Sequence, residues 1–188
     1  KWDTKTKDPL TVYVSGGNTQ IITQYGDGYR VMGETLDIGI GNLFDVLGRE
    51  IGLEYAHGAV LERLAKSGRY ITETPYSVKG MNFVFTGLLT HASKRMIGKY
   101  KNEDVVYSVM HNAFAQVTEA AERALCLTHK KEILLCGGVA QNKMFQAMLS
   151  RIADYHNAKF AVPRNEFNAD NGAMIAYTGY LQFKRMRS

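Results

Sequence analysis

The chain has 188 residues, of which 45% are hydrophobic and 22% are charged. This balance is typical of a globular protein and excludes a disordered tail, a collagen-like fibre and a disulfide-stapled miniprotein. The formal net charge of +5 at pH 7 permits a nucleic-acid partner without requiring one.

Several features bear on where the protein works. No apolar run approaches the roughly 20 residues that cross a bilayer, and the charged start of the chain does not resemble a signal peptide. Cys126 and Cys136 both lie in apolar stretches, so we expect buried, reduced thiols and a cytoplasmic protein. Because the first residue is Lys1 rather than Met, we expect the chain to be part of a longer polypeptide.

The first part of the chain alternates short apolar segments with glycine-containing turns. Strands are predicted over residues 10–14, 19–25 and 29–36. The turns between them contain Gly16-Gly17 and Gly26-Asp27-Gly28, and such close spacing favours an antiparallel meander.

In the middle of the chain, the spacing of apolar residues changes to that of a helix. The apolar spacing predicts helices over residues 40–51, 57–66, 86–100 and 103–129. A polar loop at 68–80 and a short strand around Phe83 and Phe85 separate the second helix from the third. The apolar stripe of the longest helix indicates a core helix.

The last part of the chain alternates strands and helices. Strands are predicted over 132–136 and 159–162, each followed by a helix, at 139–155 and 168–183. No linker rich in Pro, Gly or Ser divides the chain. We therefore expect one α/β domain with a helical insertion.

Glycine pairs follow two of the predicted strands. Gly16-Gly17 and Gly137-Gly138 can let a ligand touch the backbone and direct free N–H groups at it, which suits a phosphate. Each pair also fits an ordinary tight turn. Asp170 opens the last predicted helix, either as an N-cap or as a metal ligand.

Several enzyme signatures do not occur in the sequence. It contains no Walker A motif, no GxSxG elbow and no kinase HRD or DFG motif, which disfavours a P-loop enzyme or a serine hydrolase. The five histidines do not pair at i, i+4, and neither CxxC nor HExxH occurs. A complete metal site within this chain is therefore not expected.

The run Tyr13–Gln20 reads YVSGGNTQ and the run Gly33–Asp37 reads GETLD. Together they closely resemble the TsaD family, the tRNA threonylcarbamoyltransferases that form the catalytic subunit of KEOPS complexes in archaea and eukaryotes. Further matching runs follow in family order over nearly the whole chain: Gly41-Asn42 with Asp45, Glu62–Ala65, Phe83–Leu88, Cys136–Asn142 and Asp170–Ala176.

The resemblance implies an RNase H-like lobe of the actin-like and sugar-kinase-like ATPase superfold, with a mixed sheet flanked by helices. Residues 1–188 would be the C-terminal lobe, with a helical insertion over about 41–130 and no N-terminal lobe. By resemblance, ATP or threonylcarbamoyl-AMP would be bound by Ser15, Gly16, Gly17, Asn18, Asp45, Gly58, Glu62, Gly138 and Asn142.

The resemblance also implies one divalent metal, which would be iron, zinc or magnesium. Asp170 and Tyr13 would be its ligands here, and two histidine ligands would come from the N-terminal lobe. No side chain of this chain is expected to act as a catalytic nucleophile.

The implied activity is that of an acyltransferase. It would move the threonylcarbamoyl group of threonylcarbamoyl-AMP to N6 of the adenosine next to the anticodon in tRNAs that read ANN codons. Expected partners are tRNA, the KEOPS kinase subunit, fused to the chain in some relatives, and the small KEOPS dimerisation subunit. Candidate tRNA contacts are Lys94, Arg95, Lys99 and Lys101, which otherwise form a solvated face.

Two other functions stay open at this stage. One is an ATPase or kinase of the same superfold, since a fold does not determine a function. The other is a non-catalytic lobe on which the KEOPS kinase subunit docks. We expect the 188-residue chain alone to be inactive as an enzyme, because half of the cleft would be missing.

Overall fold

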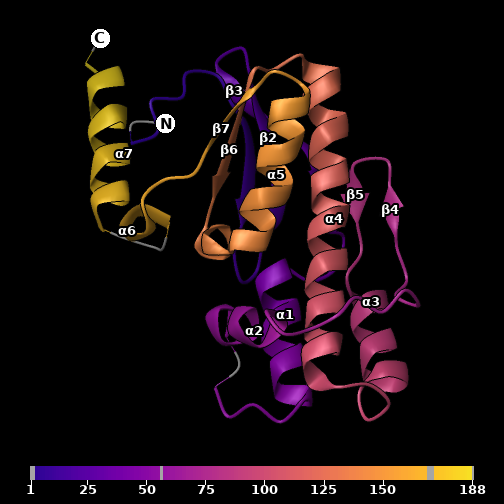
Figure 1. The fold of residues 1–188 in the computed structure, drawn as a ribbon. Helices are drawn as coiled ribbons and strands as arrows, with labels where there is room; N and C mark the ends of the chain where they lie inside the picture. Colours follow the sequence, from indigo (N-terminus) through magenta and orange to yellow (C-terminus); the bar gives the residue numbers. More distant parts are fainter. Residues whose placement is uncertain (1–2, 56, 169–171, 188) are drawn as a thin grey trace.

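Five strands form one mixed sheet in the computed structural model of the protein (Figure 1). The structure describes residues 3–55, 57–168 and 172–187. The sheet order is β3-β2-β1-β6-β7, with its strands at β1 Leu10–Val14, β2 Thr19–Tyr25, β3 Gly28–Glu34, β6 Glu132–Cys136 and β7 Lys159–Ala161. The predicted meander is confirmed, because β1 pairs antiparallel with β2 and β2 pairs antiparallel with β3.

The central strand β1 joins the antiparallel and parallel halves of the sheet. Val12 lies between Ile21 of β2 and Leu135 of β6, and β1 runs parallel to β6. Leu10, Val12 and Val14 alternate along β1 and are fully buried, because successive side chains of a strand point to opposite faces. The parallel pairing brings the carboxyl ends of β1 and β6 to the same edge of the sheet.

Two long helices, α4 (Asn102–Thr128) and α5 (Lys143–Tyr155), pack against the sheet (Figure 1). Aromatic rings connect them with α1 (Ile40–Glu50). Phe114 of α4 stacks on Phe145 of α5 at 4.6 Å between ring centroids and meets Phe44 of α1 edge-on at 5.4 Å. The three rings are buried and form the centre of the core.

The chain between β3 and β6 is mostly helical. It contains α1, α2 (Gly58–Ala65), a hairpin of β4 (Val78–Lys79) and β5 (Asn82–Phe83), α3 (Thr86–His91) and α4. Its longest helix, α4, has buried residues along its whole length, as its apolar stripe predicts.

The single helix predicted over 86–100 is wrong in its second half. After α3 the backbone widens into one π turn, η1 (Ala92–Met96), in which the Ile97 N–H donates to the Ala92 carbonyl at 2.9 Å. The turn ends at Ile97, whose backbone is extended, and Gly98 follows with φ +82°. Gly98 supplies the left-handed conformation that stops the helix.

The helix predicted over 139–155 is also divided. A 3₁₀ turn, η2 (Gly138–Gln141), precedes α5, and Asn142 stands between them. The Asn142 side chain accepts a hydrogen bond from the Phe145 N–H at 3.2 Å. This N-cap determines where α5 begins, because it satisfies a donor that a continuous helix would bond internally.

The predicted burial of both cysteines is wrong for Cys126, which is exposed on α4. Ala124 and Leu125, which precede it, are buried, and Cys126 lies just beyond this buried stripe of α4. Its apolar neighbours in the sequence therefore do not make it buried. Cys136, at the end of β6, is half-buried, and burial raises the pKa of its thiol to about 11.

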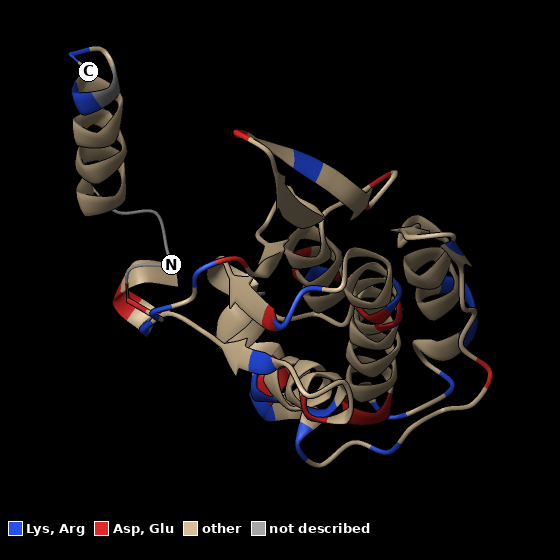
Figure 2. Cartoon of the chain, turned by 90° about the horizontal axis from the view of Figure 1, so that it is seen from above, with Lys and Arg blue, Asp and Glu red and all other residues tan. Residues whose placement is uncertain are grey.

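The helix predicted over 168–183 is found as α7 (Gly172–Arg185), and a short helix that the sequence did not predict, α6 (Asn165–Asn168), comes before it in the chain. Figures 1 and 2 show α7 standing apart from the sheet and the other helices. Among the helices that the structure describes, none combines the length and the apolar composition needed to cross a membrane.

Candidate functional site

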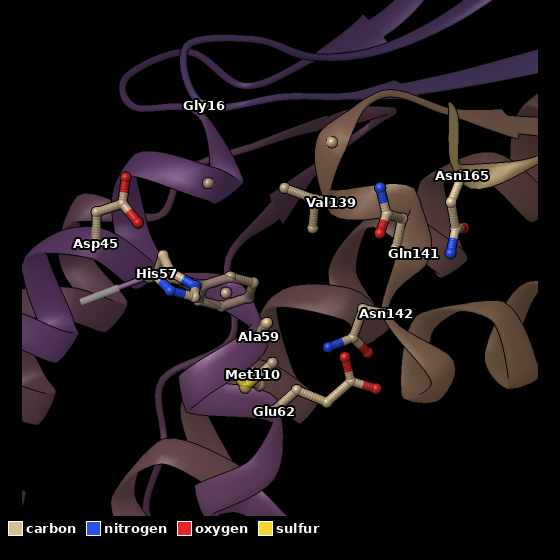
Figure 3. Close-up of a pocket in the computed structure, with 14 residues that line it drawn as sticks. Gly16, Asp45, His57, Ala59, Glu62, Met110, Val139, Gln141, Asn142 and Asn165 are labelled. Atoms are coloured by element: carbon tan, nitrogen blue, oxygen red, sulfur yellow. The ribbon is translucent and has the colours of Figure 1, made fainter. Parts of the chain in front are cut away.

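A hollow of about 450 Å³ lies at the carboxyl ends of β1 and β6 (Figure 3). Ligands of α/β proteins bind preferentially at this edge of the sheet. The β1–β2 turn, the first turns of α1 and α2, and the segment from η2 to α5 form its walls. Six residues predicted to bind a nucleotide line it, namely Gly16, Asp45, Gly58, Glu62, Gly138 and Asn142.

The β1–β2 turn is closed by its own hydrogen bonds. The Ser15 N–H donates to the Asn18 carbonyl at 2.8 Å, and the Asn18 N–H donates to Ser15 Oγ at 3.1 Å. Ser15, Gly17 and Asn18 therefore flank the lining residue Gly16 and do not line the hollow themselves. Within the described residues, the N–H groups of Gly16 and Gly17 have no acceptor, so they are available to an anion.

The N-terminus of α1 is occupied by this turn. Gly41 donates its N–H to the Ser15 carbonyl at 3.1 Å, and Asn42 donates to the Gly16 carbonyl at 3.0 Å. A Cβ at Gly41 would lie 2.7 Å from Gly16 Cα, so only glycine permits this approach. Free N–H donors in this part of the hollow consequently belong to the turn rather than to α1.

The two glycines after β6 have different reasons to be glycine. Gly137 adopts φ +104°, and a Cβ there would lie 2.1 Å from the Val14 carbonyl oxygen of β1. Gly138 has an ordinary φ and would meet nothing within 4 Å, and the same holds for Gly58 at the start of α2. Packing and backbone strain explain Gly137, whereas Gly58 and Gly138 leave open space that a ligand can fill.

Three polar side chains face the hollow from different elements. Figure 3 shows Asp45 of α1 on one side, with Glu62 of α2 and Asn142 next to each other on the other side. Glu62 Oε1 accepts the Lys143 N–H at 2.9 Å, which caps the start of α5. The second oxygen of Glu62 and the side-chain amide nitrogen of Asn142 are left for a ligand.

Of the two predicted metal ligands, the structure describes only Tyr13. Tyr13 is half-buried in β1, paired with Gln20 of β2 and Cys136 of β6. Asp170 lies outside the described residues. The ranges 3–55, 57–168 and 172–187 contain no group of three His, Cys, Asp or Glu side chains that could hold a metal ion. Because Asp170 lies outside these ranges, its pairing with Tyr13 at a metal stays a prediction, and we assign no chemical step to a metal.

Sequence reasoning missed several lining residues, including Phe44, His57, Gln141 and Asn165. Phe44 belongs to an apolar stripe, and its ring packs against Phe114 in the core although the residue also lines the hollow. His57 immediately precedes α2 and is next to Gly58. This position is the one feature of the sequence that could have indicated that His57 lines the hollow. Asn165 begins the short helix α6, and nothing in its sequence context points to the hollow.

The fold agrees with the prediction when it is compared with solved structures. HypF of T. kodakarensis matches with a TM-score of 0.64 at 18% identity, over 85% of this chain and 21% of that one. A full-length HypF in a phosphate- and nucleotide-bound form matches with a TM-score of 0.62 at 11% identity, over 85% of this chain and 31% of that one. At these identities the likeness shows the fold alone, that of an RNase H-like lobe of the actin-like ATPase superfold.

The sequence has much closer relatives. The tRNA N6-adenosine threonylcarbamoyltransferase of Archaeoglobus fulgidus is 49% identical over 98% of this chain and 57% of its own length. That of Thermococcus sibiricus is 50% identical over 95% of this chain and 55% of its own length. A probable bifunctional tRNA threonylcarbamoyladenosine biosynthesis protein of Methanococcus maripaludis is 48% identical over 99% of this chain and 35% of its own.

The chain thus spans a little over half the length of the transferases that it matches. The family model described as "TsaD: tRNA N6-adenosine threonylcarbamoyltransferase" matches residues 1–177, which cover the β1–β2 turn, the hollow and the start of α7. The chain therefore belongs to the TsaD family of tRNA N6-adenosine threonylcarbamoyltransferases.

Proposed function

We propose that this chain is the C-terminal lobe of a tRNA N6-adenosine threonylcarbamoyltransferase and that the hollow binds its nucleotide substrate. One observation carries the proposal. Gly58 and Gly138 come from distant parts of the sequence, line the same hollow, and have no packing reason to lack a side chain. A ligand that fills the space beside both glycines explains them together.

The polar groups around the hollow suit a nucleotide. The free N–H groups of Gly16 and Gly17 are donors for the phosphate, with Ser15 and Asn18 holding the turn closed. Asp45 and Glu62 accept hydrogen bonds from ribose hydroxyls on either side of the hollow, and Gly138 and Asn142 border the adenosine. Carboxylates are pure acceptors when ionised, so they match hydroxyl donors.

In the proposed reaction, N6 of the tRNA adenosine attacks the carbamoyl carbon of threonylcarbamoyl-AMP. A C–N bond forms, the bond from that carbon to the phosphate oxygen breaks, N6 loses a proton, and AMP leaves. The Gly16 and Gly17 N–H groups stabilise the negative charge that the phosphate gains as it leaves. The contribution of this chain is to bind and orient the nucleotide.

We also propose the wider setting in which this lobe works. It includes an N-terminal lobe, one divalent metal with Asp170 and Tyr13 among its ligands, and tRNA, the KEOPS kinase subunit and the small KEOPS dimerisation subunit as cytoplasmic partners. The bifunctional relative of Methanococcus maripaludis, nearly three times as long as the matched region, supports a fusion to a further functional unit in some members.

The proposal is tested with the full-length protein, an unmodified tRNA transcript that reads ANN codons, and threonylcarbamoyl-AMP. The modified adenosine is quantified by liquid chromatography and mass spectrometry, and nucleotide affinity is measured by calorimetry. Gly58→Val and Gly138→Val each fill the open space and should weaken nucleotide binding by about tenfold or more. Gly87→Val is the matched control, because Gly87 at the start of α3 also has nothing within 4 Å but does not line the hollow.

Three outcomes would contradict the proposal. Wild-type affinity in both hollow variants would show that the nucleotide binds elsewhere. ATP hydrolysis or small-molecule phosphorylation without tRNA, and no modified adenosine, would favour an ATPase or kinase of the superfold. Tight binding of the kinase subunit with no nucleotide affinity would favour a docking lobe.

A further inference from the structure

A second hollow, of about 530 Å³, lies beside the π turn that follows α3. We call it the π-turn hollow, and it is lined by Glu73, His91, Lys94, Arg95, Ile97, Gly98 and Lys99. Three of these side chains are cations and one is a carboxylate. Ile97 is the single apolar side chain in this lining, so the hollow is polar and positively charged.

The backbone presents two of these cations. Ala92 and Met96, the first and last residues of the π turn, are fully buried, whereas Lys94 and Arg95 between them are exposed. The Ile97 N–H bonds the carbonyl five residues back, which makes this turn one residue wider than an α turn. π turns are rare and occur frequently at functional sites, and this one holds adjacent cations at the rim of a hollow.

The single carboxylate in the lining does not neutralise the site. Glu73 lies 3.4 Å from Lys99 Nζ, and both side chains are more than half exposed, at 59% and 58%. Exposed ion pairs of this kind contribute little and exchange readily. Hydrogen bonds to Tyr100 and to Glu73 raise the pKa of Lys99, so this amine stays charged. Within the described residues, Lys94 and Arg95 have no ion-pair partner.

Another lining residue has an unsatisfied polar atom. The Nε2 atom of His91 is buried and makes no hydrogen bond to any described residue. This atom is closed off from solvent, so it is not counted among the groups that face the hollow. The three cations by themselves favour a ligand rich in acceptor oxygens.

The positive charge does not extend into the next hollow along the chain. Lys101, two residues after Lys99, lines a hollow of about 460 Å³ with Arg69, Glu103 and Asp104, so two carboxylates balance its two cations. Elsewhere, Figure 2 shows Lys and Arg scattered over many elements rather than gathered in one stripe. The attraction for an anion is therefore local to this surface, rather than a property of the whole molecule.

We propose that the π-turn hollow binds phosphates of an RNA backbone, and that Lys94, Arg95 and Lys99 contact them. This inference rests on the proposed function, in which the RNA is the tRNA substrate. Arginine pairs with phosphate through two N–H groups and lysine through a compact charge. A protein partner is less suitable, because protein interfaces bury an apolar core and the lining offers only Ile97.

The test measures binding of the full-length protein to a fluorescently labelled, unmodified tRNA transcript over a series of KCl concentrations. In the triple variant Lys94→Gln/Arg95→Gln/Lys99→Gln, the affinity at low salt should fall by about ten- to a hundredfold. The slope of log K against log salt should become shallower by about 2 to 3, because each of the three cations neutralises one phosphate in the wild-type complex.

Two further variants separate a local site from net charge and from misfolding. Lys79→Gln/Lys131→Gln/Arg151→Gln removes the same charge from exposed positions on β4, before β6 and on α5, and should change the affinity by less than about threefold. Glu73→Gln removes the competing carboxylate and should tighten tRNA binding severalfold, a gain that a misfolded protein would not show.

The inference is overturned if the triple variant binds tRNA with wild-type affinity and salt slope, or if the control triple variant weakens binding equally. It is also overturned if the triple variant keeps tRNA binding and loses a protein partner instead. Failure of the proposed function looks different: the wild-type protein would bind tRNA through this hollow but form no modified adenosine.

Discussion

At the scale of single residues, the glycines of this protein divide into those that the backbone requires and those that leave room. Gly137 has φ +104° and lies against the Val14 carbonyl, where no Cβ fits. Its neighbour Gly138 has an ordinary φ and open space around it. The sequence presents them as one Gly-Gly pair, and only the packing of β1 against the turn separates their roles.

We therefore expect opposite effects from the same substitution at these adjacent positions. Gly137→Ala should lower the free energy of unfolding by about 2 kcal/mol or more, through backbone strain and contact with β1. Gly138→Ala should leave it within about 0.5 kcal/mol of wild type. Urea denaturation followed by circular dichroism measures both, and equal losses would contradict the difference in their roles.

Asp37, the last residue of the GETLD run, joins the meander to α3. Its carboxylate accepts the N–H of Ile38 at 2.7 Å, of Phe85 at 3.0 Å and of Thr86 at 2.7 Å. Partial burial raises the pKa of Asp37, but hydrogen bonds from Thr86 and the backbone outweigh it, so the pKa lies below its ordinary 3.8. The role of this residue is structural.

The lowered pKa predicts a pH dependence of stability. Folding favours the ionised form of Asp37, so its contribution is complete above the unfolded pKa near 3.8 and is lost as the pH falls through the folded pKa. Asp37→Asn should cost about 1 kcal/mol at pH 7, reduced by solvent exposure, and less as the pH falls below 3.8. Urea denaturation at pH 7 and in acid checks this, and a cost that does not depend on pH would contradict it.

At the scale of elements, the start of α5 is coupled to the hollow at the carboxyl ends of β1 and β6, the proposed nucleotide site. Asn142 caps α5 with its own side chain, and Glu62 of α2 accepts the next N–H, from Lys143. Both residues also face the hollow. The helix begins where it does because two separate segments satisfy its free donors.

Changing the cap should therefore affect stability and binding in separable ways. Asn142→Ala should cost about 1 kcal/mol of unfolding free energy, whereas Asn142→Asp preserves an N-cap acceptor and should cost less than about 0.5 kcal/mol. Both variants lose the amide donor that faces the hollow, so both should weaken nucleotide binding. Thermal unfolding and calorimetry measure the two effects, and wild-type nucleotide affinity in both variants would remove Asn142 from the site.

At the scale of the whole molecule, α7 carries large apolar side chains that the other described elements do not cover. Ile175 is 68% exposed, and Tyr177, Tyr180 and Phe183 are each 52% exposed. The chain also spans little more than half the length of its curated transferase relatives. Exposed apolar side chains that gather on one helix favour contact with a further protein surface.

We expect the 188-residue chain by itself to form no modified adenosine, because the proposed nucleotide site lies between two lobes and catalysis requires both sides of the cleft. Mass spectrometry of tRNA incubated with threonylcarbamoyl-AMP and the purified chain checks this, with the full-length protein as the positive control. Turnover by the chain alone would contradict the two-lobe proposal.

The sequence by itself determined the family, the meander, the buried stripe of α4 and six of the residues that line the hollow at the carboxyl ends of β1 and β6. These depend on local periodicity and on contiguous motifs such as YVSGGNTQ, which need no knowledge of distant contacts. Only the tertiary structure decided that Gly58 and Gly138 leave the same space open, that Glu62 caps α5 and that Cys126 is exposed. It also decided that α3 ends in a π turn holding Lys94 and Arg95 beside Glu73. Each of these depends on segments that are distant in the chain and meet only when the sheet and helices pack, so local patterns do not encode them.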